Sequence, residues 1–140
     1  MKITTRITLF LLAVLTLLCL ASCADVEATG AWESATYTSD KTFGNGGKTV
    51  TVEVKAEEQS VTFTLKTDAE TLGDALLEHG LIAGEEGPYG LYVKTVNGML
   101  ADYDADASYW NFTKNGELMM TGVDMTPIAD GEHYELTKTR

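Results

Sequence analysis

The chain has 140 residues, of which 21 are acidic and 10 are basic, and its formal net charge is −11. This length supports one domain with a modest core, and so negative a surface repels phosphate groups, which makes nucleic acid a poor candidate partner. Both cysteines fall within the first 23 residues, so disulfides and thiolate metal sites are excluded from the rest of the chain.

Residues 1–22 have the pattern of a secretory signal peptide. Lys2 and Arg6 give a positive start, and residues 7–20 form an apolar stretch that is too short to be a spanning helix. Small residues then lead into Cys23, a pattern that resembles the bacterial lipobox. We therefore expect cleavage before Cys23 and acylation of its thiol, palmitate included, which would anchor the protein at the extracytoplasmic face of the cell membrane. A secreted protein in which this cysteine is incidental is the alternative.

Residues 23–47 are predicted to form a lipid-anchored flexible linker. The segment is rich in Ala, Thr, Ser, Glu and Gly and shows no sustained hydrophobic period. Trp32, Tyr37 and Phe43 are unusual in a linker, so part of the segment is a candidate for docking on the domain or on a partner. We place the folded domain at residues 48–140.

The first ordered elements are predicted to be a β-hairpin and then a short helix. Apolar and polar residues alternate on both sides of an acidic turn at residues 56–59, which indicates two strands with one buried face. The alternating residues are Val50, Val52 and Val54, then Val61, Phe63 and Leu65. The period becomes that of a helix over residues 72–77, with Thr71 and Asp74 resembling a capping box and Gly80 ending the element.

Four more strands are predicted after a glycine-rich loop. Residues 91–96 end at an Asn-Gly turn, residues 109–114 turn at a second Asn-Gly pair into residues 117–120, and residues 132–138 come last. Two strands, one helix and then several strands indicate an α+β fold that is β-grasp-like, with a mixed or antiparallel sheet covered by one short helix. A ferredoxin-like topology is less favoured because no second helix is visible.

Four segments together resemble the C-terminal β-domain of the transcobalamin and intrinsic factor family. They are residues 92–98 (YVKTVNG), residues 108–112 (SYWNF), the pair Gly122-Val123 and residues 131–136 (GEHYEL). The similarity extends over residues 48–140. Bacterial members of this wider domain family, whose function is unknown, are often small surface lipoproteins. The resemblance thus identifies the chain as a transcobalamin-like surface lipoprotein.

The resemblance implies a protein that captures cobalamin or a related corrinoid for uptake. In the vitamin carriers this domain packs over one face of the corrin ring, and aromatic, thioether and amide groups suit such a ligand. The residues implied to line the ligand are Thr95, Val96, Asn97, Gly98, Met99, Leu100, Trp110, Asn111, Phe112, Leu118 and Met119. None of them is predicted to coordinate a metal. The carriers' helical domain is missing here, so we expect a transporter subunit or a second surface protein to complete the site.

Structural roles compete for the same residues. Trp110 and Phe112 alternate on one strand and could belong to the core, and Met119, Met120 and Met125 could form an adaptable surface or fill gaps in a core. An adhesive or structural surface module that binds protein or glycan is therefore the alternative function. A partly exposed Trp110 beside Asn97 and Met119 would favour the corrinoid site, whereas a buried Trp110 would favour the adhesive module.

Motifs for catalysis are missing from the sequence. It contains no HExxH, no Gly-x-Ser-x-Gly and no phosphate-binding glycine loop. We therefore predict that the protein is not an enzyme and has neither catalytic residues nor a catalytic cofactor. Residues 102–106 begin like a calcium loop, but Ala107 stands where that loop needs glycine, so a solvated acidic loop is expected.

Overall fold

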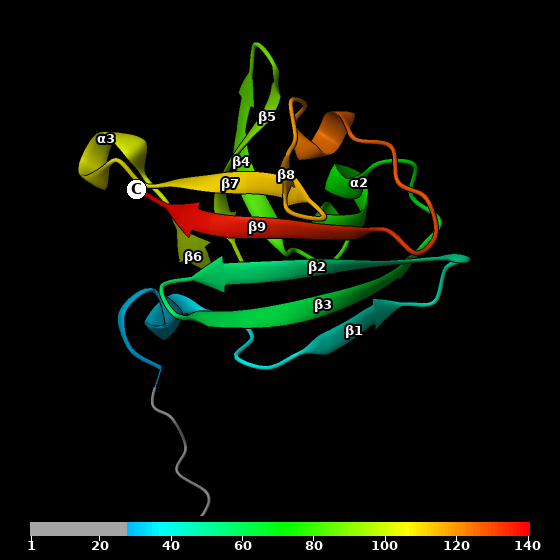
Figure 1. Cartoon of the computed structure of the whole chain (residues 1–140), viewed down its shortest axis with the longest axis horizontal. Coiled ribbons are helices and arrows are strands. Elements are labelled where there is room, and N and C mark those ends of the chain that lie inside the picture. The colour runs from blue at the N-terminus through cyan, green and yellow to red at the C-terminus, as the bar shows by residue number, and fades with distance from the viewer. Residues whose placement is uncertain (1–27) are drawn as a thin grey trace, which may run out of the picture.

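The computed structural model describes residues 28–140 (Figure 1). The predicted signal peptide and the predicted lipid site at Cys23 lie outside these described residues. The strands are β1 (Lys41–Gly44), β2 (Lys48–Ala56), β3 (Gln59–Thr67), β4 (Ile82–Gly87), β5 (Gly90–Val96), β6 (Met99–Leu100), β7 (Tyr109–Lys114), β8 (Glu117–Leu118) and β9 (His133–Thr139). The helical elements are η2 (Gly30–Ser34), α2 (Leu72–Leu77), α3 (Tyr103–Asp106) and η3 (Val123–Met125). Among these residues we find no helix with the length and apolarity that a bilayer crossing requires.

The described strands form two sheets. The larger one has the order β1-β3-β2-β9-β7-β8, and it is mixed because β1 runs parallel to β3 and β2 runs parallel to β9. The smaller one has the order β4-β5-β6 and is antiparallel. The predicted α+β class and the mixed sheet are confirmed, and the predicted hairpin of residues 48–67 is formed by β2 and β3.

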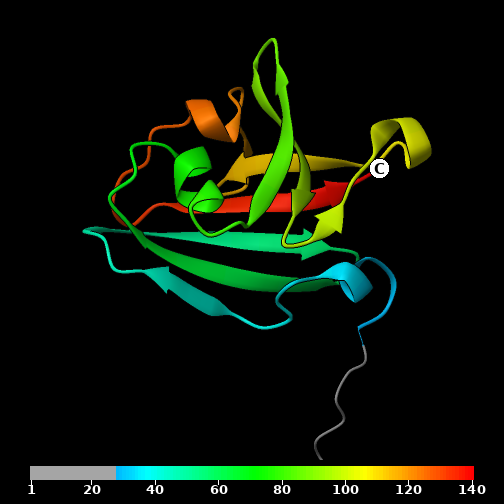
Figure 2. The same cartoon turned by 180° about the vertical axis from the view of Figure 1, so that it is seen from behind.

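One face of the larger sheet carries the core. The smaller sheet, α2 and η3 contribute to the core on this face, and Figure 2 shows the smaller sheet and α2 in front of the strands. Alternation puts Val52 and Val54 opposite Tyr134 and Leu136 on the inner face, and Glu53 opposite Glu135 on the outer face. The outer face is polar, as one face of such a sheet can be when it meets water.

The helix α2 forms as predicted. The Thr71 hydroxyl accepts a hydrogen bond of 3.2 Å from the backbone N–H of Asp74, and Gly80 adopts the left-handed conformation after the helix end. Leu72, Ala75 and Leu76 are buried on the face that meets the sheet.

The prediction of a single helix is wrong, because the described residues contain a second short α-helix. The acidic segment expected to be a loop contains α3, because the Asp102 side chain accepts hydrogen bonds from the N–H groups of Asp104 and Ala105. Ala107, with a φ of 59°, ends this helix in the left-handed conformation.

The glycine-rich loop expected before residue 91 is also partly wrong, because it contains β4. This strand pairs with β5 through an irregularity between Ala83 and Gly84. A Cβ at Gly84 would lie 2.0 Å from the carbonyl oxygen of Tyr92, so only glycine allows the two backbones to approach this closely.

The flexible linker predicted for residues 23–47 is wrong from residue 28 onward. Trp32 is buried, and its Nε1–H donates a 2.9 Å hydrogen bond to the carbonyl oxygen of Ala56. Phe43 lies on β1 and contacts Tyr37 and Phe63 edge to face, with ring centroids 5.3 and 5.6 Å away. The docking on the domain that the three aromatic residues suggested is therefore present, and the domain begins before residue 48.

Candidate functional site

The structure places three of the predicted ligand-lining residues in the core. Val96, Asn97 and Met99 are buried at the turn between β5 and β6. The Asn97 side chain accepts a hydrogen bond of 2.9 Å from the N–H of Tyr37 and donates one of 2.8 Å to its carbonyl oxygen. Both ends of this amide are thus occupied within the fold. We correct the prediction and remove these three side chains from the candidate site.

The other residues of that turn do not form a pocket with Trp110 either. Thr95 is half-buried and pairs with Ala83 and Leu100 inside the smaller sheet, whereas Gly98 and Leu100 are exposed. The four hollows described below are lined by none of the six predicted residues 95–100.

The residues predicted on β7 divide between the two faces of the larger sheet. Trp110 and Phe112 point to the inner face, whereas Asn111 lies on the outer face. Asn111 therefore cannot contact a ligand that rests on Trp110, and we remove it from the site. The Trp110 side chain is 8 % exposed, and its Nε1–H donates a 3.1 Å hydrogen bond to the carbonyl oxygen of Lys94. Phe112 stacks on Tyr134 at 5.8 Å.

Trp110 and Phe112 line a hollow of about 130 Å³ that shares lining residues with two larger ones. The adjoining hollows have volumes of about 290 and 330 Å³, and Gly122 lines all three. We call this region the tip surface. Its residues are Pro88, Tyr89, Leu91, Tyr92, Met120, Gly122 and Met125.

The tip surface combines the end of the β4–β5 hairpin with the segment from β8 to η3. Figure 1 shows the hairpin projecting beyond the sheets with the orange η3 segment beside it. Tyr89 and Met120 are each 91 % exposed, and Met125 is also exposed. These exposed aromatic and thioether side chains make the tip surface the candidate functional site.

None of the tip-surface residues was predicted as a site residue, although Trp110 and Phe112 line its smallest hollow. Leu118 is exposed and Met119 half-buried, both just before Met120. Tyr89 and Tyr92 were not predicted as site residues, and the cluster of three methionines was the signal that could have located the surface. Which of these apolar side chains is exposed depends on how the hairpin folds over η3, and local sequence does not show this.

Asp124 joins the two halves of the tip surface. One carboxylate oxygen, Oδ2, accepts a 3.0 Å hydrogen bond from the N–H of Leu91. The other oxygen, Oδ1, is buried and has no hydrogen-bond partner within residues 28–140. The carboxylate thus fixes the position of the hairpin relative to η3.

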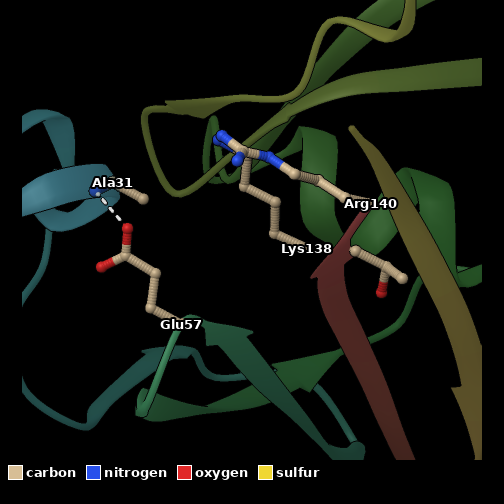
Figure 3. Close-up of a pocket in the computed structure, with 5 residues that line it drawn as sticks. Ala31, Glu57, Lys138 and Arg140 are labelled. Atoms are coloured by element: carbon tan, nitrogen blue, oxygen red, sulfur yellow. Dashed lines mark hydrogen bonds between the residues drawn. The ribbon is translucent and has the colours of Figure 1, made fainter. Parts of the chain in front are cut away.

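A fourth hollow lies apart from these three and has a different chemistry. It has a volume of about 250 Å³ and is lined by Ala31, Glu57, Lys138, Thr139 and Arg140. Figure 3 shows the Glu57 carboxylate accepting a hydrogen bond from the N–H of Ala31, with Lys138 and Arg140 on the opposite side. None of the predicted site residues lines this hollow, and its mixed charges do not match a flat apolar ligand.

Ionizable groups near β9 have structural partners. Burial alone would raise the pKa of Glu132, but hydrogen bonds from Lys114, Tyr134 and the N–H of Ala129 outweigh it and lower the pKa to about 2. Burial, and then the Glu132 carboxylate, raise the pKa of Tyr134. Across residues 28–140 we find no group of three or more His, Cys, Asp and Glu side chains placed to hold a metal ion.

Comparisons with known proteins give one family match and similar solved structures. Residues 69–137 match the family described as Domain of unknown function (DUF4430). A crystal structure of a proposed metal binding protein from Ruminococcus gnavus ATCC 29149 is 39 % identical, with a TM-score of 0.64, and the match covers 67 % of this chain and 98 % of that one. No curated protein matches the chain.

Haptocorrin in complex with Cbi (cobinamide) is a more distant structural neighbour. It is 18 % identical with a TM-score of 0.58, and the match covers 70 % of this chain and 26 % of haptocorrin. At this identity the likeness concerns the fold, and it confirms the predicted transcobalamin-like fold. The family follows from the Ruminococcus protein, almost all of which this chain covers, together with the match over residues 69–137: the chain belongs to the DUF4430 domain family.

Proposed function

We propose that this protein is a non-enzymatic, lipid-anchored surface protein that uses the tip surface to capture a corrinoid for uptake. The proposal rests on the exposure of Tyr89, which lines two of these hollows, and of Met120, which lines one of them. A corrinoid is large, flat and edged with amides and methyl groups, so it suits an aromatic and thioether surface with nearby backbone groups. The shared fold with haptocorrin, whose structure contains Cbi, supports the same ligand class.

The tip surface would cover only one side of such a ligand. Its hollows are open, and the described residues supply no second wall. We therefore propose that a transporter subunit or another surface protein covers the other side. Anchoring both proteins in one membrane would raise their effective concentration and offset a low affinity of the single domain.

A second candidate function is an adhesive module that binds protein through the same tip surface. The burial of Trp110 is the observation that favours it, since a corrinoid resting on this side chain was expected to leave it partly exposed. An apolar, methionine-containing surface also suits protein partners. Metal binding, which the name of the Ruminococcus protein suggests, has no supporting group of side chains among residues 28–140.

Titration of residues 24–140 with cobinamide and cobalamin tests the proposal. Trp110 lines the hollow next to Tyr92, so a bound corrinoid should quench its fluorescence, and Trp32→Phe isolates this signal. We expect saturable quenching that is weakened at least tenfold in Tyr89→Ala/Met120→Ala. Tyr103→Ala removes an exposed tyrosine from α3 and serves as the matched control. No saturable signal with either compound would contradict the corrinoid and favour the protein-binding alternative.

A further inference from the structure

The methionines of the described domain differ in exposure. Met99 is completely buried in the core. Met119 is half-buried, and its N–H donates a 3.0 Å hydrogen bond to the carbonyl oxygen of Phe112. Met120 and Met125, in contrast, are 91 % and 61 % exposed, and both line the hollow of about 330 Å³ on the tip surface. The most exposed methionines among residues 28–140 are therefore those of the candidate site.

An exposed thioether reacts with a peroxide while the protein stays folded. One oxygen of hydrogen peroxide passes to the sulfur, the O–O bond breaks, and the other oxygen leaves as water with both hydrogens. The sulfur loses two electrons and the peroxide gains them, and the product is a polar sulfoxide in place of a flexible apolar thioether. Met99 can react only when the core opens, whereas Met120 and Met125 are accessible in the folded state.

The hydrogen bonds that hold η3 do not involve the methionine side chains. The Thr126 hydroxyl donates a 2.8 Å hydrogen bond to the carbonyl oxygen of Gly122, and the N–H of Met125 donates one of 3.1 Å to the same oxygen. The carbonyl oxygen of Thr126 accepts a 3.0 Å hydrogen bond from the N–H of Leu72, which connects this segment to α2. Oxidation at sulfur leaves these bonds intact, so it changes the chemistry of the surface and preserves the fold.

We propose that Met120 and Met125 are oxidation sites through which peroxide turns off binding at the tip surface. This inference rests on the proposed function and adds regulation to it. Two sulfoxides place polar oxygens in the hollow where Pro88 and Tyr89 supply apolar surface, and covering these oxygens with an apolar ligand removes their hydration. Methionine sulfoxide reductases reverse the step: a dithiol becomes a disulfide, and the oxygen leaves as water.

Peptide mapping by mass spectrometry tests the two sites directly. Residues 24–140, which contain every described element, are treated with hydrogen peroxide, and catalase then removes the excess. We expect Met120 and Met125 to be oxidised at least about tenfold faster than Met99, with the midpoint of urea unfolding unchanged. An equal rate at Met99, or a lower unfolding midpoint after oxidation, would contradict the proposal.

Titration with cobinamide tests the effect on binding. Oxidised wild type should bind at least about tenfold more weakly than the untreated protein, and reductase treatment should restore its affinity. Met120→Leu/Met125→Leu should have the same affinity before and after peroxide treatment. Met119→Leu makes the same substitution beside the site and should stay as sensitive to peroxide as the wild type. If the wild type bound cobinamide equally well after oxidation, the proposal would be wrong and the function would stand.

Retention on a hydrophobic-interaction column tests the sites without a corrinoid. Oxidation should shorten the retention of the wild type and of Met119→Leu, but not that of Met120→Leu/Met125→Leu. If retention changes in this way and untreated protein does not bind cobinamide, the oxidation sites stand and the corrinoid function fails. Unchanged retention of the oxidised wild type would overturn the proposal, because the two side chains would then contribute no apolar surface.

Discussion

At residue 97 one amide side chain joins two segments that are 60 positions apart in the sequence. Asn97→Ala would remove the side-chain partner of the part-buried N–H and carbonyl groups of Tyr37 and place alanine at a φ of 51°. We expect the free energy of unfolding to fall by about 2–4 kcal/mol, measured by chemical denaturation. Asn115→Ala has a similar φ of 49° at an exposed turn and should cost only about 1 kcal/mol. Equal losses for the two variants would show that the Tyr37 hydrogen bonds contribute nothing.

Glu132 gives the stability of the protein a defined dependence on pH. Its folded-state pKa is lowered from 4.5 to about 2, so its stabilising effect is complete above the unfolded value and is lost as the pH falls from 4.5 towards 2. With a side chain that is 22 % exposed, the contribution is at most about 3 kcal/mol. In denaturation measurements between pH 4.5 and 2, the Glu132→Gln variant should lack the loss of stability that protonation of Glu132 causes in the wild type. If the free energy of unfolding of the variant fell with pH as steeply as that of the wild type, the Glu132 carboxylate would not have this role.

The residue scale also shows how far sequence patterns reach. Alternation along 109–114 correctly predicts that Trp110 and Phe112 share a face, and the same rule places Asn111 on the other. The Asn-Gly pair at residue 97 predicts a turn, which is present. The Asn97 side chain also forms hydrogen bonds with Tyr37. These bonds depend on a tertiary contact, which no local sequence pattern shows.

Among the elements, β1 depends on contacts with other parts of the chain. This strand pairs with β3, and Phe43 is held by the aromatic rings of Tyr37 and Phe63. Phe43→Ala should therefore lower the free energy of unfolding by about 2 kcal/mol in urea denaturation. Thr42→Ala, at the neighbouring exposed position, should change it by less than about 0.5 kcal/mol. If Phe43→Ala matched this control, residues 41–44 would not stabilise the domain.

The elements missed by sequence reasoning share a physical cause. The hairpin of β2 and β3 and the helix α2 have a hydrophobic period within their own length, and both are present as predicted. In contrast, β1 is a four-residue edge strand and β4 reads Ile-Ala-Gly-Glu-Glu-Gly, so neither has a period to detect. The strand β1 is positioned by pairing with β3, which follows only after β2, and β4 is positioned by pairing with the adjacent β5, so neither strand is shown by a pattern of its own residues.

For the molecule as a whole, the proposed anchor at Cys23 is directly testable. In a bacterial host, we expect the wild-type chain to incorporate labelled palmitate and to enter the detergent phase of a Triton X-114 extraction. Cys23→Ser should do neither and should remain in the aqueous phase. Incorporation of label by Cys23→Ser, or its absence from the wild type, would contradict the anchor.

The early start of the domain limits how far it can reach. Only five positions separate Cys23 from Ala28, where the described residues begin, and they span at most about 18 Å. A free linker up to residue 48 would extend to about 90 Å. A domain of this size is roughly 30–35 Å across, so an acylated protein would work in a layer not much thicker than itself. A partner that bears its binding surface high above the bilayer would be out of reach, and only one whose surface lies within this layer can meet the tip surface.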